Sequence, residues 1–385
     1  MDEKLYQLAL TFTPGIGDVL IKQLISYCGS ASGVFKSNTV KLTRIPGIGD
    51  VIAYNIQHHQ KSSLEKAEQE LRLIEKKPVQ ILFYTDANYP DRLKQHYDSP
   101  ALLYYHGNAD LNAARTIGIV GTRQATEYGK AATEDIIRDL QKYSPLVISG
   151  LAYGIDIAAH RACLKYQVPT LGVMATGLDI IYPSSHQKTA EAMIEQGGLL
   201  TENCFGSKPD GPRFPARNRI IAGMSDALIV VEAAAKGGAL ITAEFANNYH
   251  KDVLAVPGDM NRPTSAGCNK LIQKNKAVIY TDIGALLELL NWEEGAINAK
   301  GAFTSKTRTS GSSQQDNNRP FLAEGLIFTE EESQVIALLR TQNEMLMDEL
   351  SWKSQIPVNR MASLLLNLEF QGIVKALPGK KFVLN

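Results

Sequence analysis

Cysteine is scarce in this sequence of 385 residues, and long hydrophobic runs are missing. The four cysteines are scattered without a Cys-x-x-Cys pair, so neither a disulfide framework nor a zinc site is indicated. No apolar run approaches the roughly 20 residues that span a bilayer. The N-terminus, MDEKLYQLALTF, lacks the cationic leader of a secretory signal. We therefore expect a cytoplasmic protein with reduced thiols and no membrane partner.

Net charge is absent as well, because 40 Lys and Arg balance 40 Asp and Glu. This balance excludes a histone-like polycation. It does not exclude nucleic-acid binding, because local clusters of charge set the field that a ligand meets. The length favours two or three domains, each able to bury a core.

The common nucleotide and hydrolase fingerprints are also missing. Gly118-Ile-Val-Gly121 has the wrong spacing for the dinucleotide motif G-x-G-x-x-G, and no G-x-x-x-x-G-K-[ST] sequence occurs. Ser149 does not lie in a nucleophile elbow, and the seven histidines are dispersed without metal-ligand spacing. We expect no cofactor, no metal and no catalytic residue.

Asp156 and His160 stand four residues apart in an expected helix. That spacing fits an acid–base pair. It also fits a helix cap with a histidine packed beside it, which is the interpretation that we favour.

What the sequence does contain is a regular alternation of β-rich and helical patterns from about residue 116 to 290. This alternation predicts an α/β fold with a mostly parallel sheet covered by helices on both faces. Val79–Tyr84 and Leu102–Gly107 are expected to add strands at one edge. The main strands are expected at Thr116–Val120, Leu146–Ser149, Thr170–Met174, Gly198–Thr201, Ala227–Val231, Val253–Val256 and Ala277–Tyr280.

Almost every expected strand is followed by glycine and a polar residue. Ligands of such folds bind at the carboxyl ends of the strands. The stretch Phe214–Arg219 follows the fourth strand of the expected parallel sheet, and we expect it to be a basic loop braced by prolines. Guanidinium groups there would match phosphate oxygens. The cations near this edge are Arg123, Arg217, Arg219 and Lys236.

The first 75 residues contain a repeat. Pro14-Gly15-Ile16-Gly17 recurs as Pro46-Gly47-Ile48-Gly49, each between helical patterns. The repeat resembles tandem helix-hairpin-helix motifs, which hold DNA backbone without reading sequence. A helical module that only packs or recruits partners is the alternative, because few cations lie nearby.

The C-terminal part begins after a polar stretch that almost lacks apolar residues. We expect residues 293–320 to form a flexible linker. Three helices and a hairpin over 321–385 look like a winged helix. Its third helix carries Arg360 as its only cation. We therefore favour a protein-contact or dimer-supporting role for this domain.

Several motifs together resemble the DNA-processing protein A family, also called DprA or Smf. They are Ile119–Arg123, Ser149–His160, Gly177–Pro183, Phe214–Gly223, Val230–Glu232, Leu240–Ala243 and Ala255–Gly258. The resemblance implies an extended Rossmann domain over 79–292, between the helical domain of 1–75 and the C-terminal segments. It implies a homodimer, formed through the Rossmann domain, that binds and protects single-stranded DNA. It also implies loading of a RecA-type recombinase in natural transformation, without enzymatic activity.

The same resemblance implies a set of DNA-binding residues. They are Gly121, Thr122, Arg123, Ser149, Gly150, Gly154, Gly177, Lys188, Arg217, Asn218, Arg219, Lys236, Gly237, Gly238 and Thr242. Arg123, Arg217 and Arg219 would contact phosphates, Asn218 would order the loop, and the glycines would let the strand approach. The family usually has Ser-Gly-Ser where this chain has Gly237-Gly238-Ala239, so Lys236 would replace the missing hydroxyls.

Two other functions stay open at this point. Gly237–Thr242 with Glu244 loosely resembles the Gly-Gly-x-x-Thr-x-x-Glu pattern of nucleotide phosphoribohydrolases, although the spacing fails. A scaffold whose end modules recruit partners is the third alternative.

Overall fold

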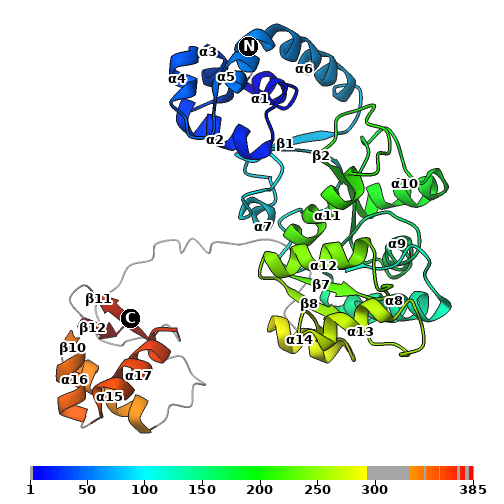
Figure 1. Cartoon of the computed structure of the whole chain (residues 1–385). Helices are drawn as coiled ribbons and strands as arrows, with labels where there is room; N and C mark the ends of the chain where they lie inside the picture. Colours follow the sequence, from blue (N-terminus) through cyan, green and yellow to red (C-terminus); the bar gives the residue numbers. More distant parts are fainter. Residues whose placement is uncertain are drawn as a thin grey trace, which may run out of the picture. The chain divides into compact units, whose positions relative to one another are not determined.

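A nine-stranded sheet forms the centre of the larger of two compact units (Figure 1). The computed structural model describes residues 3–292, 330–341, 344–354, 356–370, 373–377 and 381–384. The units divide at Lys300 and Gly301. The predicted linker lies outside the described residues. Within the described parts, no helix has the length and apolar character needed to cross a membrane.

The sheet has the order β1-β2-β6-β5-β4-β3-β7-β8-β9, and only β2 runs antiparallel to the others, so its pairs with β1 and β6 are antiparallel. The predicted parallel sheet is confirmed, and so are the two strands added at its edge. Its strands are β1 (Gln80–Phe83), β2 (Leu102–Gly107), β3 (Thr116–Val120), β4 (Leu146–Ser149), β5 (Thr170–Val173), β6 (Gly197–Thr201), β7 (Ala227–Val230), β8 (Asp252–Ala255) and β9 (Val278–Ile279).

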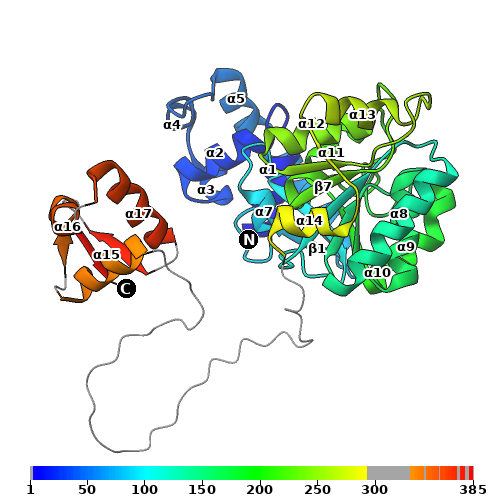
Figure 2. The same ribbon diagram turned by 90° about the horizontal axis from the view of Figure 1, so that it is seen from below.

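Helices cover both faces of this sheet, which explains why its central strands are apolar throughout (Figure 2). One face packs against α11 (Arg213–Met224), α12 (Gly238–Asn248) and α13 (Ala266–Gln273). The other packs against α8 (Glu127–Leu140), α9 (Ile155–Tyr166), α10 (Gln187–Gln196) and α14 (Ile283–Leu290). Short α7 (Asp91–Lys94) is part of the segment that connects β1 with β2 in the sequence.

The order in which strands are added to the sheet reverses at β3, which lies between β4 and β7. From β3 it continues outward through β4, β5 and β6, and then crosses to β7 on the other side. In open parallel sheets, ligands bind at the carboxyl edge near such a reversal. The segments that follow β3, β4, β5 and β7 are therefore the first place to look for a site.

One prediction about this edge is wrong. The stretch Phe214–Arg219 is not a loop but the beginning of helix α11. Pro212 occupies the N-cap position and Pro215 the first turn, where a missing backbone N–H costs no intrahelical hydrogen bond. Prolines also occur in turns, which is why the sequence favours a loop here. Helical spacing places Arg217 and Asn218 on the buried side with Ile221.

Six helices form the N-terminal part of the same unit. They are α1 (Glu3–Thr11), α2 (Asp18–Cys28), α3 (Ala31–Lys36), α4 (Thr39–Thr43), α5 (Asp50–His58) and α6 (Gln60–Ile74). We call them the helical module. The two predicted hairpins are present, with Gly15 at φ +78° and Gly47 at φ +77°.

The hairpins of the helical module hold each other by equivalent bonds. Gln23 Nε2 donates to the Pro46 carbonyl at 2.6 Å, and Asn55 Nδ2 donates to the Pro14 carbonyl at 3.1 Å. Donors and acceptors are each 32 residues apart, as in the sequence repeat. The repeat therefore folds as a pair of hairpins related by an approximate two-fold axis.

The helical module shares its core with the sheet. Phe83 of β1 and Leu102 and Tyr104 of β2 are buried in one apolar cluster with Leu5, Leu8 and other module residues. In Figure 1 the module, in blue, lies against these two strands. The module and the edge of the sheet are thus parts of one hydrophobic core.

The second unit has its own core. It contains α15 (Glu330–Thr341), α16 (Met347–Ser354) and α17 (Val358–Phe370), and a sheet of order β10-β12-β11. Its strands are β10 (Met345–Leu346), β11 (Val374–Leu377) and β12 (Lys381–Leu384). The predicted three helices and hairpin are confirmed.

Candidate nucleic-acid interface

A small hollow of about 30 Å³ opens where β3, β4 and β5 end and α11 begins. We call its surroundings the mouth. The residues that line the mouth are Arg123, Gly150, Ala152, Tyr153, Met174, Ala175, Thr176, Tyr182, Pro183 and Phe214. They come from segments that follow four neighbouring strands, β3, β4, β5 and β6, as the parallel topology requires.

Aromatic side chains surround this hollow. The rings of Phe214 and Tyr182 are 5.6 Å apart, and the Arg123 guanidinium lies 5.3 Å from the Phe214 ring centroid. Tyr153 and Tyr182 are 49% and 46% exposed, although large aromatic side chains are usually buried. Phe214 is half-buried within this cluster. The mouth therefore presents flat apolar faces beside an exposed cation.

Arg217 lies beneath the mouth and is only 4% exposed. Its guanidinium donates to the carbonyl oxygens of Gly150 and Val173, at the ends of β4 and β5. Burial lowers the pKa of Arg217 to about 10 although Asp156 opposes the shift. Burial also raises the pKa of Asp156, which Arg217 partly offsets. This arginine joins two strand ends from the inside.

Gly150 is required by the same arrangement. A Cβ atom there would lie 2.4 Å from a terminal nitrogen of Arg217 and 2.6 Å from Asp156 Oδ2. At Gly154, φ is +79° and a Cβ would lie 2.1 Å from the Thr122 carbonyl oxygen. Gly121 and Gly177 also face protein atoms closely. These four glycines let the segments of the mouth pack against one another.

Arg219 faces the other side of α11 and is held by acids. It forms ion pairs with Glu202 at 2.6 Å and with Asp18 of the helical module at 3.1 Å. Its Nε donates to the Asp98 carbonyl oxygen at 3.0 Å. Burial alone would lower its pKa, but Glu202 and the other acids raise the pKa above the usual value. In this structure protein groups thus bind the guanidinium groups of both Arg217 and Arg219.

The remaining predicted residues divide by exposure. The exposed ones are Arg123, Lys188, Lys236, Gly237 and Gly238, whereas Thr122 is half-buried. Ser149 is buried and donates to the Ile119 carbonyl oxygen at 2.6 Å. The Thr242 hydroxyl is also buried and donates within its helix.

Asn218 does not order a loop, as predicted, because it lies in a helix. Its Nδ2 donates to the Gly238 carbonyl oxygen at 3.2 Å and so connects α11 with the first turn of α12. This bond brings Lys236 and Gly237, which precede α12, to the side of α11. Strand β7 leads into that segment.

The Asp156–His160 pair has a structural role, and the predicted cap is wrong in detail. Gly154 occupies the N-cap position of α9, and Asp156 accepts a hydrogen bond from the Ala152 backbone N–H. His160 is fully buried, with Nδ1 2.7 Å from the Thr170 hydroxyl. Its Nε2 has no hydrogen-bond partner among the described residues.

We expect His160 to make the protein less stable in acid. Burial, followed by the charge of Arg217, lowers the pKa of His160 to about 3. The unfolded chain therefore binds a proton that the folded chain does not, between about pH 6.5 and pH 3. Stability from this group is complete above pH 6.5 and is lost as the pH falls, by several kcal/mol in all. Urea unfolding of His160→Gln should show a flatter pH dependence over this range than wild type; an identical slope would contradict the assignment.

Sequence reasoning missed several residues of this region. Tyr153 and Tyr182 lie in glycine-rich segments that were noted for their glycines, and an aromatic residue in such a segment is a usable signal. Asp18 gave no local signal, because its partner Arg219 is 201 residues away in the sequence.

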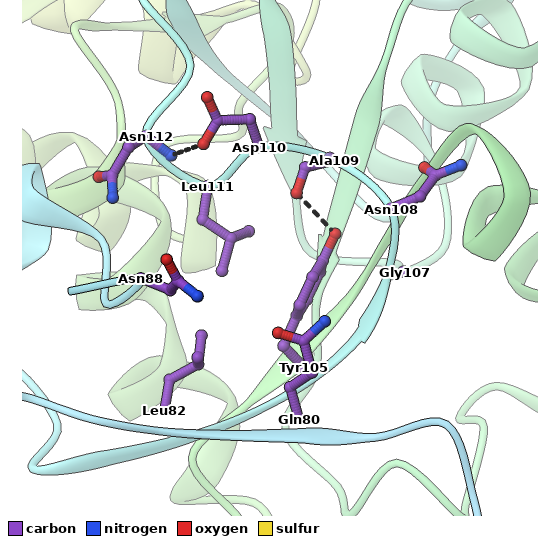
Figure 3. A pocket seen from close by; sticks show the side chains of 10 residues that line it. All are labelled: Gln80, Leu82, Asn88, Tyr105, Gly107, Asn108, Ala109, Asp110, Leu111 and Asn112. Atoms are coloured by element: carbon purple, nitrogen blue, oxygen red, sulfur yellow. Dashed lines mark hydrogen bonds between the residues drawn. The ribbon is translucent and has the colours of Figure 1, made fainter. Parts of the chain in front are cut away.

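A second hollow, of about 230 Å³, lies at the antiparallel edge of the sheet (Figure 3). Amide side chains such as Gln80 and Asn88 line it, and the Tyr105 hydroxyl donates to the Ala109 carbonyl oxygen at 2.9 Å. None of its lining residues is a lysine or arginine. It therefore offers phosphate no cationic partner. Glu244, the residue behind the phosphoribohydrolase alternative, forms an ion pair with Lys276 at 2.6 Å on an exposed surface.

Comparisons with known proteins agree on one family. The family model for DNA recombination-mediator protein A matches residues 80–291, and that for the DprA winged helix domain matches residues 322–380. Protein Smf of Synechocystis is 31% identical, over 99% of this chain and 98% of its own length. DNA processing protein DprA of Streptococcus pneumoniae is 38% identical over 53% of this chain and 72% of its own.

Two solved structures are similar as well. The X-ray structure of DNA processing protein A from Streptococcus pneumoniae has a TM-score of 0.64 at 30% identity, covering 75% of this chain and 98% of that one. DNA processing protein A from Helicobacter pylori has a TM-score of 0.50 at 29% identity, covering 55% and 95%. The Helicobacter structure concerns that protein's binding of single-stranded DNA.

Proposed function

The chain belongs to the DNA recombination-mediator protein A family, also called DprA or Smf, and on this basis we propose that it binds single-stranded DNA across the mouth. Its role is in DNA processing during recombination. The similar protein from Helicobacter pylori binds single-stranded DNA, which supports the choice of ligand.

One observation carries this proposal: exposed aromatic rings and an exposed arginine lie together at the carboxyl edge of the sheet. Bases stack on aromatic rings whatever their sequence, while cations follow the phosphates. Tyr153 and Tyr182 are the proposed stacking surfaces, with Phe214 behind Tyr182. Binding of this kind tolerates any sequence and prefers unpaired strands, whose bases are free to stack.

We assign the direct phosphate contacts to the exposed groups. Arg123, Lys188 and Lys236 supply charge, and Gly237 and Gly238 supply backbone N–H groups at the start of α12. Arg217 and Arg219 act from beneath, by holding the segments that carry these groups. Gly150 and Ser149 belong to that support.

The finer biological role is part of the proposal. We propose that the protein protects single-stranded DNA in the cytoplasm, helps to load a RecA-type recombinase, and forms a homodimer through its Rossmann domain. A strand-exchange assay with recombinase and single-strand-binding protein tests the loading. Sedimentation of the full chain tests the dimer.

We expect Arg123→Ala and Lys236→Ala each to weaken binding and to reduce its salt dependence. The slope of log K against log salt is negative, and each lost phosphate contact on a single strand reduces its magnitude by about 0.7. Fluorescence anisotropy of a labelled oligothymidine over a range of salt concentrations measures both effects.

The matched control for these variants is Lys142→Ala. Lys142 is exposed after the C-terminal end of α8, at the opposite, amino edge of the sheet. It should keep the wild-type slope. If Arg123→Ala and Lys236→Ala keep it too, the mouth is not the binding surface.

A further inference from the structure

The segment Glu202–Pro212 connects β6 with α11, and we call it the connector. It leads directly to Phe214 of the mouth and carries Lys208, an exposed cation. The side chain of Arg213 donates back to the Lys208 carbonyl oxygen at 3.1 Å. The position of the connector therefore affects where one wall of the mouth lies.

A buried acid of the helical module holds the middle of the connector. Glu70 of α6 is only 5% exposed and accepts a hydrogen bond from the Phe205 backbone N–H at 2.8 Å. The next N–H, of Gly206, donates to Asp179 at 3.0 Å. Asp179 lies in the same segment as Tyr182, so this contact joins the connector to the mouth.

A second acid of the module reaches the start of the connector through Arg219. Asp18 forms the ion pair with Arg219 of α11, and Arg219 in turn pairs with Glu202 at the start of the connector. The other carboxylate oxygen of Asp18 accepts from the Ala101 N–H at 2.8 Å, next to β2. Asp18 is thereby fixed to the sheet while it holds the helix.

We infer that Asp18 and Glu70 are positioning residues for DNA: from the helical module, they fix the connector and the first turns of α11 in the shape that binds a strand. The inference rests on the proposed function of the mouth. The helical module then serves DNA binding without contacting DNA through these residues. A partner that moves the module would change DNA affinity, because the two share these contacts.

The sign of the effect distinguishes positioning from simple electrostatics. Removing a negative charge near a DNA-binding surface strengthens binding if only long-range charge matters. Positioning gives the opposite result, because the freed connector must be ordered again when DNA binds. We expect Asp18→Asn and Glu70→Ala each to weaken binding of an oligothymidine by about 5-fold or more.

Conservative and matched variants sharpen the test. Glu70→Gln keeps an oxygen that accepts from the Phe205 N–H, so it should bind nearly as tightly as wild type. Asp50 is the repeat equivalent of Asp18, 32 residues later, and it is exposed. Asp50→Asn therefore removes the same charge from the same module, and it should bind as tightly as wild type or slightly more tightly.

Hydrogen exchange of the full chain gives a readout that does not need DNA. Glu70→Ala should speed exchange at Phe205, whereas Glu70→Gln and Asp50→Asn should not. If wild type fails to bind oligothymidine, the proposed function and this inference both fall. If wild type binds, and Asp18→Asn and Glu70→Ala bind as tightly or more tightly, the inference alone is wrong. Should Glu70→Ala not fold, the comparison of Asp18→Asn with Asp50→Asn decides.

Discussion

Removal of residues 1–75 will leave the rest of the large unit unable to fold stably. The helical module covers Phe83, Leu102 and Tyr104, which are at most 4% exposed in the intact chain. Without the module these side chains face water. The deletion also takes away Asp18 and Glu70, the partners of Arg219 and of the connector.

The expected loss is large compared with the stability of an ordinary domain. Burial of one large apolar side chain contributes about 1.5–3 kcal/mol. Exposure of three of them therefore costs roughly 5 kcal/mol or more, against a total stability of about 5–15 kcal/mol. We expect the truncated protein to aggregate or to bind a hydrophobic dye at 25 °C, and to lack a cooperative unfolding transition.

The control is removal of the other end. The unit that begins at Gly301 has a core made of its own residues, such as Val335 and Leu365. A chain that ends at Lys300 should unfold in urea with the midpoint of the large unit in the full protein. If the chain that lacks residues 1–75 unfolds at the same midpoint as well, the shared core contributes little and this prediction is wrong.

The reason that this dependence was not predicted lies in β1 and β2. Their sequences, Val79–Tyr84 and Leu102–Gly107, have the apolar character of edge strands, and periodicity correctly placed them at the edge of the sheet. Periodicity shows that a residue is buried but not what buries it. Phe83 and Tyr104 could have packed on a sheet helix as easily as on the module.

The strands of the parallel sheet were predictable because each carries its own signal, a short apolar run bounded by glycine and polar residues. The start of α11 was not, because proline is compatible with both a turn and the first turn of a helix. Ile220 and Ile221, which follow, are buried in the apolar cluster of the sheet. This packing favours a helix over a turn, but it is visible only in the structure.

The candidate site shows the same limit. The sequence indicates the carboxyl edge of the sheet and the arginines near it, because these follow from strand order. It does not indicate which arginines are free. Arg219 pairs with Asp18, 201 residues away, and Arg217 with carbonyl oxygens at the ends of two other strands. Local charge counts treat these two and the exposed Arg123 alike.

Replacement of Arg217 by alanine should be among the most destabilising single changes in the protein. It removes the donor from the carbonyl oxygens of Gly150 and Val173 and leaves the buried Asp156 without its nearby cation. Loss of one partner from a buried charged pair costs about 3–5 kcal/mol. Arg213→Ala is the matched control, because Arg213 begins the same helix and is half-buried; a change at such a site is worth about 0.5 kcal/mol or less.

The pH dependence of this variant reports on Asp156 and on His160, because the charge of Arg217 lowers the pKa of both groups, and the Asp156→Asn double variant isolates Asp156. Burial already raises the pKa of Asp156 above its unfolded value, and loss of Arg217 raises it further. A group with a raised folded pKa favours the folded state below the unfolded pKa and loses that contribution as the pH rises through the folded pKa. The destabilisation of Arg217→Ala should therefore be smaller near pH 4 than at pH 7. At pH 7, addition of Asp156→Asn should restore part of the lost stability.

Measurements of DNA binding distinguish the buried Arg217 from the exposed Arg123. Measured well below the unfolding temperature, Arg217→Ala should weaken binding of oligothymidine, because the ends of β4 and β5 are no longer joined. It should do so without lowering the salt slope, since a buried guanidinium releases no counterion when DNA binds. Arg123→Ala should lower affinity and slope together. An Arg217→Ala slope reduced by as much as that of Arg123→Ala would mean that Arg217 leaves its carbonyl partners and contacts phosphate directly.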